Sequence, residues 1–170
     1  MKSPLMSLIA GVLGISAASA TDALKDGELA LPKHYTHWAV FLKDVQRPDV
    51  QQVRELYVNS VGAKAKPGKP FPVGTIFVME NHQATASASG AATPGAIARI
   101  FVMQKIKGTP AEVPEGLQNG SWVYASFTAD GKPAADDYTK CRACHLPQAQ
   151  KDFVQRYDDY FKAHEASGKT

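Results

Sequence analysis

The pattern of hydrophobic and polar positions predicts strands in the middle of the chain. Four stretches are rich in aromatic and β-branched residues and are bounded by turn-forming residues, as is typical of strands. They are residues 35–43, 74–80, 97–106 and 121–127. The stretch 74–80 has apolar side chains at both odd and even positions, which predicts a strand that is covered on both faces.

Two further segments have hydrophobic residues at helical spacing. The first begins at Pro48 and is expected to end before Gly62, with the recurring residues Val50, Val53, Leu56 and Tyr57. The second is a C-terminal helix with the aligned residues Phe153, Val154, Tyr157, Tyr160 and Phe161. Segments rich in Pro, Gly and small residues, such as 63–73 and 84–95, are expected to be loops. The expected fold is therefore α+β and β-rich, an antiparallel sheet with flanking helices.

The first twenty residues have the organisation of a secretory signal peptide. Lys2 supplies the positive start, residues 5–13 are mostly apolar, and the segment ends in an Ala-x-Ala cleavage site. The apolar run is too short for a membrane span, although retention of the segment as an anchor is the alternative. Cleavage leaves residues 21–170, expected to form a single domain in a bacterial periplasm.

Charge and composition narrow the classes of partner. The formal net charge is +3, and it falls to +2 when Lys2 is removed with the signal. No basic stripe interleaved with aromatic residues is present, which argues against a nucleic-acid partner. No long apolar stretch follows the signal, so no membrane span is expected after cleavage.

Cys141, Cys144 and His145 form a Cys-x-x-Cys-His motif that uses both cysteines of the chain. This is the attachment pattern of c-type haem. Two thiols at this spacing lie on one side of a helical turn, where each can form a thioether with a vinyl group of the same porphyrin. The histidine is then held beneath the ring as an axial ligand of iron. The motif predicts one covalent haem c on a C-terminal attachment helix.

Three other interpretations of the cysteine pair remain open. A thioredoxin-like disulfide normally follows the first strand of a βαβ unit, whereas this motif follows most of the fold. A structural zinc site needs four ligands, and the remaining histidines are scattered along the chain at His34, His37, His82 and His164. The third is a chance occurrence of the motif.

The order of these segments resembles that of the cytochrome P-460 family. The matching stretches are residues 31–35 with Trp38, 74–80, 104–108, 119–122 and 141–145, followed by the aromatic C-terminal helix. The resemblance covers nearly all of the chain after the signal. It implies a β-sheet domain with a few helices, one c-type haem and commonly a homodimer. The best-known members oxidise hydroxylamine and carry a lysine cross-linked to the haem. Relatives called cytochromes c′-beta lack the cross-link and bind nitric oxide or carbon monoxide.

The sequence departs from the hydroxylamine oxidisers at two places. The resemblance places Met79 where the cross-linking lysine is expected, and no lysine lies between Pro70 and Lys105. An acidic residue that assists turnover is expected near Met103, where no carboxylate is found, and Glu80 should point to the opposite face from Met79. These departures favour electron transfer or binding of a small gas. Oxidation of hydroxylamine or nitric oxide is the alternative, so enzymatic activity stays open.

The sixth ligand of the iron has two candidates, Met79 and then Met103, because thioether sulfur is a soft ligand that suits haem iron. Ordinary core positions are the alternative for both methionines. In that case the distal face is expected to be apolar and capped by residues such as Phe77, Met79 or Phe101. An apolar face admits uncharged diatomic gases and disfavours anions.

Several charged, histidine and aromatic residues have a candidate role or an expected position. Arg142 and Lys140 are candidates for pairing with a haem propionate, and a solvated surface position is the alternative for each. His34 and His37 could act as distal acids, but surface or core positions are expected. Tyr124 is expected in the core. The expected partners are a small gas or hydroxylamine and a redox-partner protein.

Overall fold

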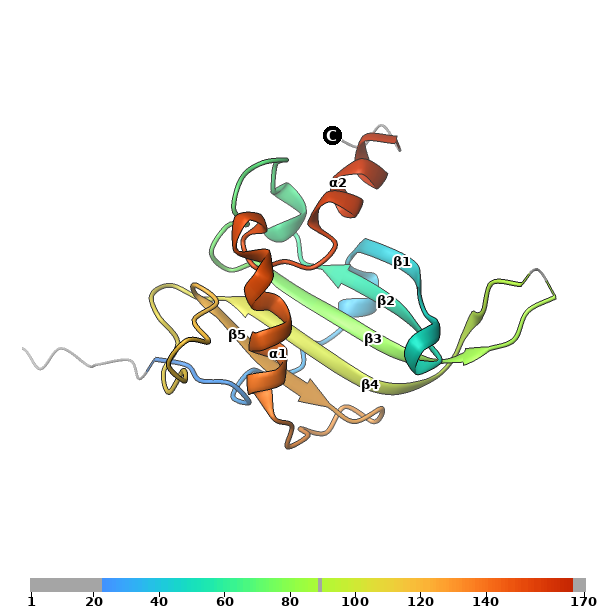
Figure 1. Cartoon of the computed structure of the whole chain (residues 1–170), viewed down its shortest axis with the longest axis horizontal. Coiled ribbons are helices and arrows are strands. Elements are labelled where there is room, and N and C mark those ends of the chain that lie inside the picture. Colours follow the sequence, from blue (N-terminus) through green and yellow to red (C-terminus); the bar gives the residue numbers. More distant parts are fainter. Residues whose placement is uncertain (1–22, 89, 167–170) are drawn as a thin grey trace, which may run out of the picture.

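An antiparallel sheet forms the centre of the molecule in this computed structural model, which describes residues 23–88 and 90–166 (Figure 1). In this part of the chain, five strands pair in the order β1-β2-β3-β4-β5. They are β1 (Ala39–Arg47), β2 (Gln52–Val58), β3 (Ile76–Thr85), β4 (Thr93–Lys105) and β5 (Trp122–Phe127). Each strand lies beside the one before it in the sequence, so the sheet is a meander. The signal predicted at residues 1–20 lies outside the described residues.

Helices are short and lie mainly at the two ends of the described chain. The α-helices are α1 (Tyr138–His145) and α2 (Tyr157–Ala166). The 3-10 helices are η1 (Tyr35–His37), η2 (Pro48–Val50), η3 (Gly62–Lys64) and η4 (Leu146–Lys151). This confirms the predicted β-rich α+β class. Among the described residues, no helix combines the length and the apolar character that crossing a bilayer requires.

The helix predicted from Pro48 is wrong. A 3-10 helix does begin at Pro48, but it ends at Val50, and Gln51 then adopts a positive φ of 51° that turns the chain into β2. β2 pairs with β1 on one side and β3 on the other, so its backbone groups find partners in the sheet. Both faces of this inner strand are covered, and apolar residues such as Val53 and Leu56 therefore occur on both, which mimics helical spacing.

The other predicted elements are present with shifted ends. The strand expected at residues 35–43 begins only at Ala39, because η1 occupies the preceding turn. β3 and β4 continue beyond the predicted strands into an arm that projects from the body of the molecule (Figure 1). The C-terminal helix begins at Tyr157, so Phe153 and Val154 lie in the turn before it.

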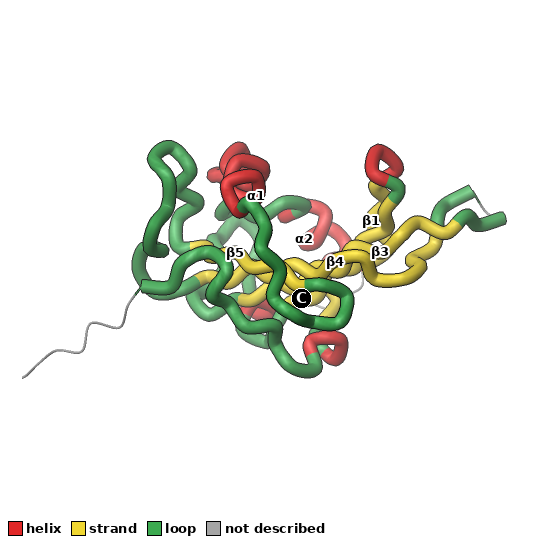
Figure 2. Tube along the Cα trace, turned by 90° about the horizontal axis from the view of Figure 1, so that it is seen from below, coloured by secondary structure: helices red, strands yellow, loops and turns green. Residues whose placement is uncertain are grey.

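The sheet buries both faces, against different parts of the chain. On the side of α1, which we call the α1 face, the core is formed by Phe41, Val58, Phe71, Phe77, Met103, Trp122, Tyr124, Val154, Tyr157, Tyr160 and Phe161. On the other side, which we call the back face, it is formed by Leu29, Tyr35, Tyr57, Val78, Ile100, Val102, Val123, Ala125 and Phe127. In Figure 2, α1 lies on one side of the sheet. The expectation that β3 is covered on both faces is thus confirmed.

Candidate functional site

A cavity of about 380 Å³, which we call the α1 cavity, lies between α1 and the α1 face of the sheet. Its volume falls within the range of cofactor sites. The wall formed by the sheet is apolar and consists of Phe41, Leu56, Phe77, Met79, Phe101 and Met103. Leu56, Met79 and Phe101 are direct neighbours across β2, β3 and β4. Strand pairing therefore collects side chains that are far apart in the sequence onto one surface.

Met79 and Phe77 lie on this wall, on the opposite side of β3 from Glu80, as strand alternation predicts. Glu80 is buried on the back face, where it accepts a hydrogen bond from Tyr35. Met103 lies on the wall opposite Phe77. The roles of the two methionines toward a bound group stay predictions.

Cys141 and Cys144 project from one turn of α1 and both line the α1 cavity as free thiols. Residues three apart in a helix share one face, which explains the common direction. Burial raises the pKa of the Cys141 thiol to about 11, so this thiol is protonated at neutral pH. Among the described residues, the two thiols belong to no compact group of three or more metal-ligating side chains, and the zinc interpretation therefore gains no support.

His145 ends α1 and faces the cavity with one ring nitrogen already engaged. Its Nδ1 lies 2.7 Å from the carbonyl oxygen of Phe153, and because a carbonyl only accepts, Nδ1 carries the hydrogen. Burial lowers the pKa of His145, which favours the neutral ring. The lone pair is therefore on Nε2. This tautomer, fixed by a backbone carbonyl, is the one that histidine ligands of metals commonly have.

The turn that supplies this carbonyl is strained and firmly held. Asp152 and Phe153 have positive φ angles of 54° and 60°, a region that bulky residues rarely adopt. Trp122 donates its indole N–H to the Asp152 carbonyl at 2.8 Å, and the Lys105 ammonium lies 2.7 Å from the Asp152 carboxylate. These contacts fix the turn, and the turn fixes the orientation of the His145 ring.

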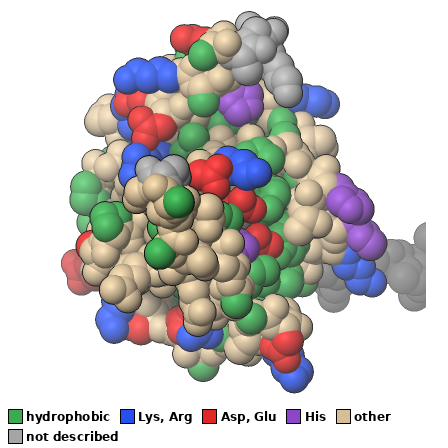
Figure 3. Space-filling view, turned by 90° about the vertical axis from the view of Figure 1, so that its right-hand side faces the viewer, with side chains coloured by type: hydrophobic (Ala, Val, Ile, Leu, Met, Phe, Trp, Pro, Cys, Tyr) green, Lys and Arg blue, Asp and Glu red, His purple; other side chains and the backbone are tan. Residues whose placement is uncertain are grey.

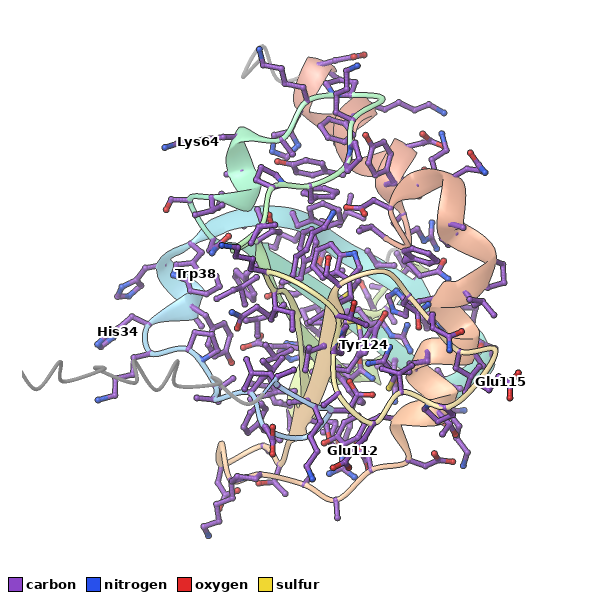
Figure 4. All side chains as sticks on the ribbon, turned by 90° about the vertical axis from the view of Figure 1, so that its left-hand side faces the viewer. His34, Trp38, Lys64, Glu112, Glu115 and Tyr124 are labelled. Carbon is purple, nitrogen blue, oxygen red and sulfur yellow. The ribbon has the colours of Figure 1, made fainter. Side chains whose placement is uncertain are left out.

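Among residues 23–88 and 90–166, three buried polar atoms at the cavity have no hydrogen-bond partner: Arg54 Nε, Asn81 Oδ1 and Tyr124 Oη. Such atoms are rare in folded proteins and mark places where a further group completes the structure. Tyr124 also packs its ring 5.3 Å from that of His145, and Figure 4 shows it between the sheet and α1. The expected core position of Tyr124 is thus also a position at the site.

Sequence reasoning missed Arg54 and Asn81. Asn81 follows Met79 at the next position on the same face, and Arg54 is its direct partner on β2. Alternation from Met79 could have indicated Asn81. Arg54 was hidden because its segment was predicted as a helix. Burial lowers the pKa of Arg54. With Lys140 and with Arg47, whose guanidinium also pairs with Asp49 at 2.7 Å, Arg54 gives the cavity a basic rim.

Arg142 does not have the role that the sequence predicts. Its side chain is 1% exposed and donates from Nε to Asp26 Oδ2 at 2.6 Å and from Nη2 to Asp26 Oδ1 at 2.9 Å. It also donates to the carbonyl of Trp122 at 3.3 Å. Arg142 is therefore neither a cavity residue nor a solvated surface charge. It fastens α1 to β5 and to the N-terminal segment. Lys140, the other candidate, does lie at the cavity.

His34 and His37 are remote from the cavity. Their rings stack on each other with centroids 5.9 Å apart, and Figure 4 shows His34 on the side of the molecule away from α1. A role for either as a distal acid is therefore not supported.

The residues around the α1 cavity fit the haem that the sequence predicts. Two thiols and one imidazole nitrogen face the same space, the opposite wall is apolar, and the unpartnered polar atoms lie around it. The comparisons with known proteins agree. A family model described as Cytochrome P460 matches residues 32–156, which is more than half of the chain. A search of curated proteins finds no match.

Proposed function

The chain belongs to the cytochrome P460 family and is therefore a haem protein, and on this premise we propose that it carries one haem c. Cys141 and Cys144 would form the thioether bonds, and His145 would be the proximal ligand of the iron. The observation that carries this assignment is the hydrogen bond from His145 Nδ1 to the Phe153 carbonyl, which leaves Nε2 as the ligand atom. The basic rim of Arg47, Arg54 and Lys140 would offset the charge of the propionates.

We further propose that the site binds a small uncharged gas such as nitric oxide or carbon monoxide. When bound, the haem would supply an iron atom at which such a gas coordinates. The sheet wall would supply apolar surroundings that favour a diatomic gas over water or anions. Among the described residues, the lining of the cavity contains no aspartate or glutamate. This supports binding over hydroxylamine oxidation, because no carboxylate stands ready to take up protons.

Electron transfer is a second candidate, and the position of Met79 favours it. The Met79 thioether lies on the wall of the cavity, and a histidine with a methionine is a common axial pair of electron-carrying cytochromes. A carrier would need a redox-partner protein. Oxidation of hydroxylamine or nitric oxide is the remaining alternative. It gains no support, because β3 contains no lysine and the described lining of the cavity contains no carboxylate.

Two further parts of the proposal rest on the sequence alone. The signal-like residues 1–20 support export to a periplasm, where haem c is attached after translocation. The family resemblance supports a homodimer, which light scattering of the purified protein would test.

Absorption spectroscopy tests the proposal directly. The protein is matured in a periplasm that has haem-attachment machinery, and spectra are taken in the ferric form, after dithionite, and after carbon monoxide. We expect a high-spin spectrum that shifts with carbon monoxide, and haem that acidic acetone does not extract. The double variant Cys141→Ala/Cys144→Ala should release its haem to the same solvent. Extractable haem in the parent protein would contradict covalent attachment, and sharp low-spin bands that ignore carbon monoxide would favour the electron carrier.

A further inference from the structure

A second group of metal-ligating side chains lies on the back face of the sheet. Glu55 from β2 and Glu80 and His82 from β3 each bring a ligand atom to within 4.8 Å of the others. We infer that these three residues bind a divalent transition-metal ion, in a site separate from the haem. The inference does not depend on the proposed function of the α1 cavity.

The two carboxylates oppose each other, and the imidazole of His82 contacts one of them, Glu80, at 2.9 Å. Glu55 and Glu80 are direct partners across β2 and β3, and like charges at such positions destabilise a sheet. Glu80 is 4% exposed, and buried carboxylates are normally paired or bound to a metal. Within the described part of the chain, neither carboxylate forms an ion pair with a lysine or an arginine. A metal ion would supply the missing positive charge.

His82 presents the atom that a metal ion needs. Its Nδ1 lies 2.8 Å from the carbonyl oxygen of Gly95, which can only accept, so Nδ1 carries the hydrogen. Its Nε2 lies 2.9 Å from Glu80 Oε2, so in the ion-free protein this nitrogen donates to the carboxylate, and a bound ion would take the place of that hydrogen. A histidine whose second nitrogen donates to a backbone carbonyl is the usual outer arrangement of a metal-bound imidazole.

Two tyrosines orient the carboxylates. Tyr35 donates its hydroxyl hydrogen to Glu80 Oε1 at 2.7 Å, and Tyr57 donates to Glu55 Oε2 at 3.0 Å. Each glutamate therefore has one oxygen held by a tyrosine, and its other oxygen lies toward the group, where that of Glu80 contacts His82. Metal ligands commonly have such outer partners.

The donor set indicates the class of ion. One imidazole nitrogen and two carboxylate oxygens suit Zn²⁺ and its first-row neighbours, whereas Ca²⁺ and Mg²⁺ prefer oxygen ligands alone. Two ligand atoms 2.9 Å apart, each about 2.1 Å from an ion, subtend an angle of about 90°. Glu55 is half-buried, so it has the freedom to close onto the ion and leaves a route from solvent. Acidic and histidine side chains gather beside the projecting β3–β4 arm in Figure 3.

An ion at this position would join β2 to β3 directly behind the wall of the α1 cavity. Glu80 stands between Met79 and Asn81, whose side chains line that cavity. The ion would therefore stiffen the strands that carry the wall, from the opposite face.

The inference is tested on the haem-loaded protein with Zn²⁺ as the probe. Any unattached thiol is first capped with iodoacetamide, and bound metal is removed with EDTA followed by gel filtration. Isothermal titration calorimetry with ZnCl₂ should give one ion per chain, and the same addition should raise the melting temperature. Glu55→Gln, at a half-buried position, should weaken Zn²⁺ binding by at least about tenfold. Loss of a residue that only orients a metal ligand already costs about 10–100-fold in affinity.

The matched control is His34→Ala/His37→Ala, which removes a pair of stacked histidines outside the site and should leave Zn²⁺ binding unchanged. Circular dichroism checks that each variant folds. No uptake of Zn²⁺ by the parent protein would overturn the inference. So would binding that is undiminished in Glu55→Gln, or binding that disappears in the control. Haem content is measured separately, so a chain without covalent haem would contradict the proposed function and leave this result standing.

Discussion

The buried polar side chains on the two faces of the sheet differ in their hydrogen bonding. On the α1 face, Arg54 Nε, Asn81 Oδ1 and Tyr124 Oη are buried without a hydrogen-bond partner. On the back face, Glu80 and His82 contact each other and are held further by a tyrosine hydroxyl and a backbone carbonyl. Asn81 of the first set stands between Glu80 and His82 of the second on β3. Unpartnered atoms also occur away from the cavity, at Gln52, Thr75 and Asn119, so it is the grouping of three of them at the cavity that suits a large bound group. On the back face, Glu80 and His82 have their hydrogen bonds but lack positive charge.

The largest effect that would sharpen this comparison is expected at His145. In His145→Ala the haem should stay attached through the cysteines but lose its proximal ligand, so the ferrous spectrum of the parent and its response to carbon monoxide should be lost. Glu80→Gln on the back face is the matched control and should keep both. An unchanged spectrum in His145→Ala would show that another residue holds the iron.

The buried ion pair of Arg142 and Asp26 should give the next largest effect, on stability. Asp26→Ala leaves the Arg142 charge buried and unpaired, so we expect the free energy of unfolding to fall by about 3–5 kcal/mol. Guanidinium chloride denaturation measures this. Asp130→Ala, which removes an exposed pair with Lys132, should leave the midpoint unchanged. A loss of less than about 1 kcal/mol in Asp26→Ala would mean that Arg142 does not fasten α1 as described.

Two tyrosines, one on each face, allow the most direct test of the contrast. Tyr35→Phe removes the hydroxyl that donates to Glu80, and should lower the free energy of unfolding by about 1–3 kcal/mol without altering the haem spectrum. Tyr124→Phe removes an unpartnered hydroxyl beside His145, so it should alter the spectrum with little loss of stability. The two measurements are denaturation and ferric absorption. If each variant shows the effect expected of the other, the contrast between the faces is wrong.

The smallest effect is expected at Met79 on the cavity wall. Met79→Leu nearly conserves volume, so its effect on stability should stay below about 1.5 kcal/mol. If the wall only excludes water, carbon monoxide binding should also stay unchanged. A parent spectrum that is low-spin and becomes high-spin in Met79→Leu would instead identify Met79 as the sixth ligand.

Most of the sheet could be predicted because its strands have clear local sequence patterns. Residues 74–80, 97–106 and 121–127 combine β-branched and aromatic side chains with turn residues at their ends, and most of each stretch lies in a strand. β2 could not be predicted, because an inner strand with both faces covered has no strict alternation. That one error hid Arg54 at the cavity and the pairing of Glu55 with Glu80.

Arg142 shows a second limit of local reasoning. Its place inside the Cys-x-x-Cys-His motif suggested contact with a bound group, since neighbours in sequence are close in space. In a helix, however, adjacent residues point in different directions. Arg142 consequently points away from the face shared by Cys141 and Cys144 and meets Asp26, far away in the sequence.

The sequence by itself determined the chemistry at α1 and the class of the fold, because both depend on spacings of a few residues. Two thiols one helical turn apart and a histidine beside them predict the same ligand wherever the helix lies. Only the tertiary structure decided the wall opposite the motif, the turn that brings the Phe153 carbonyl to His145, and the second group of ligands on the back face. These depend on strand register and on contacts between distant segments, which no local pattern encodes.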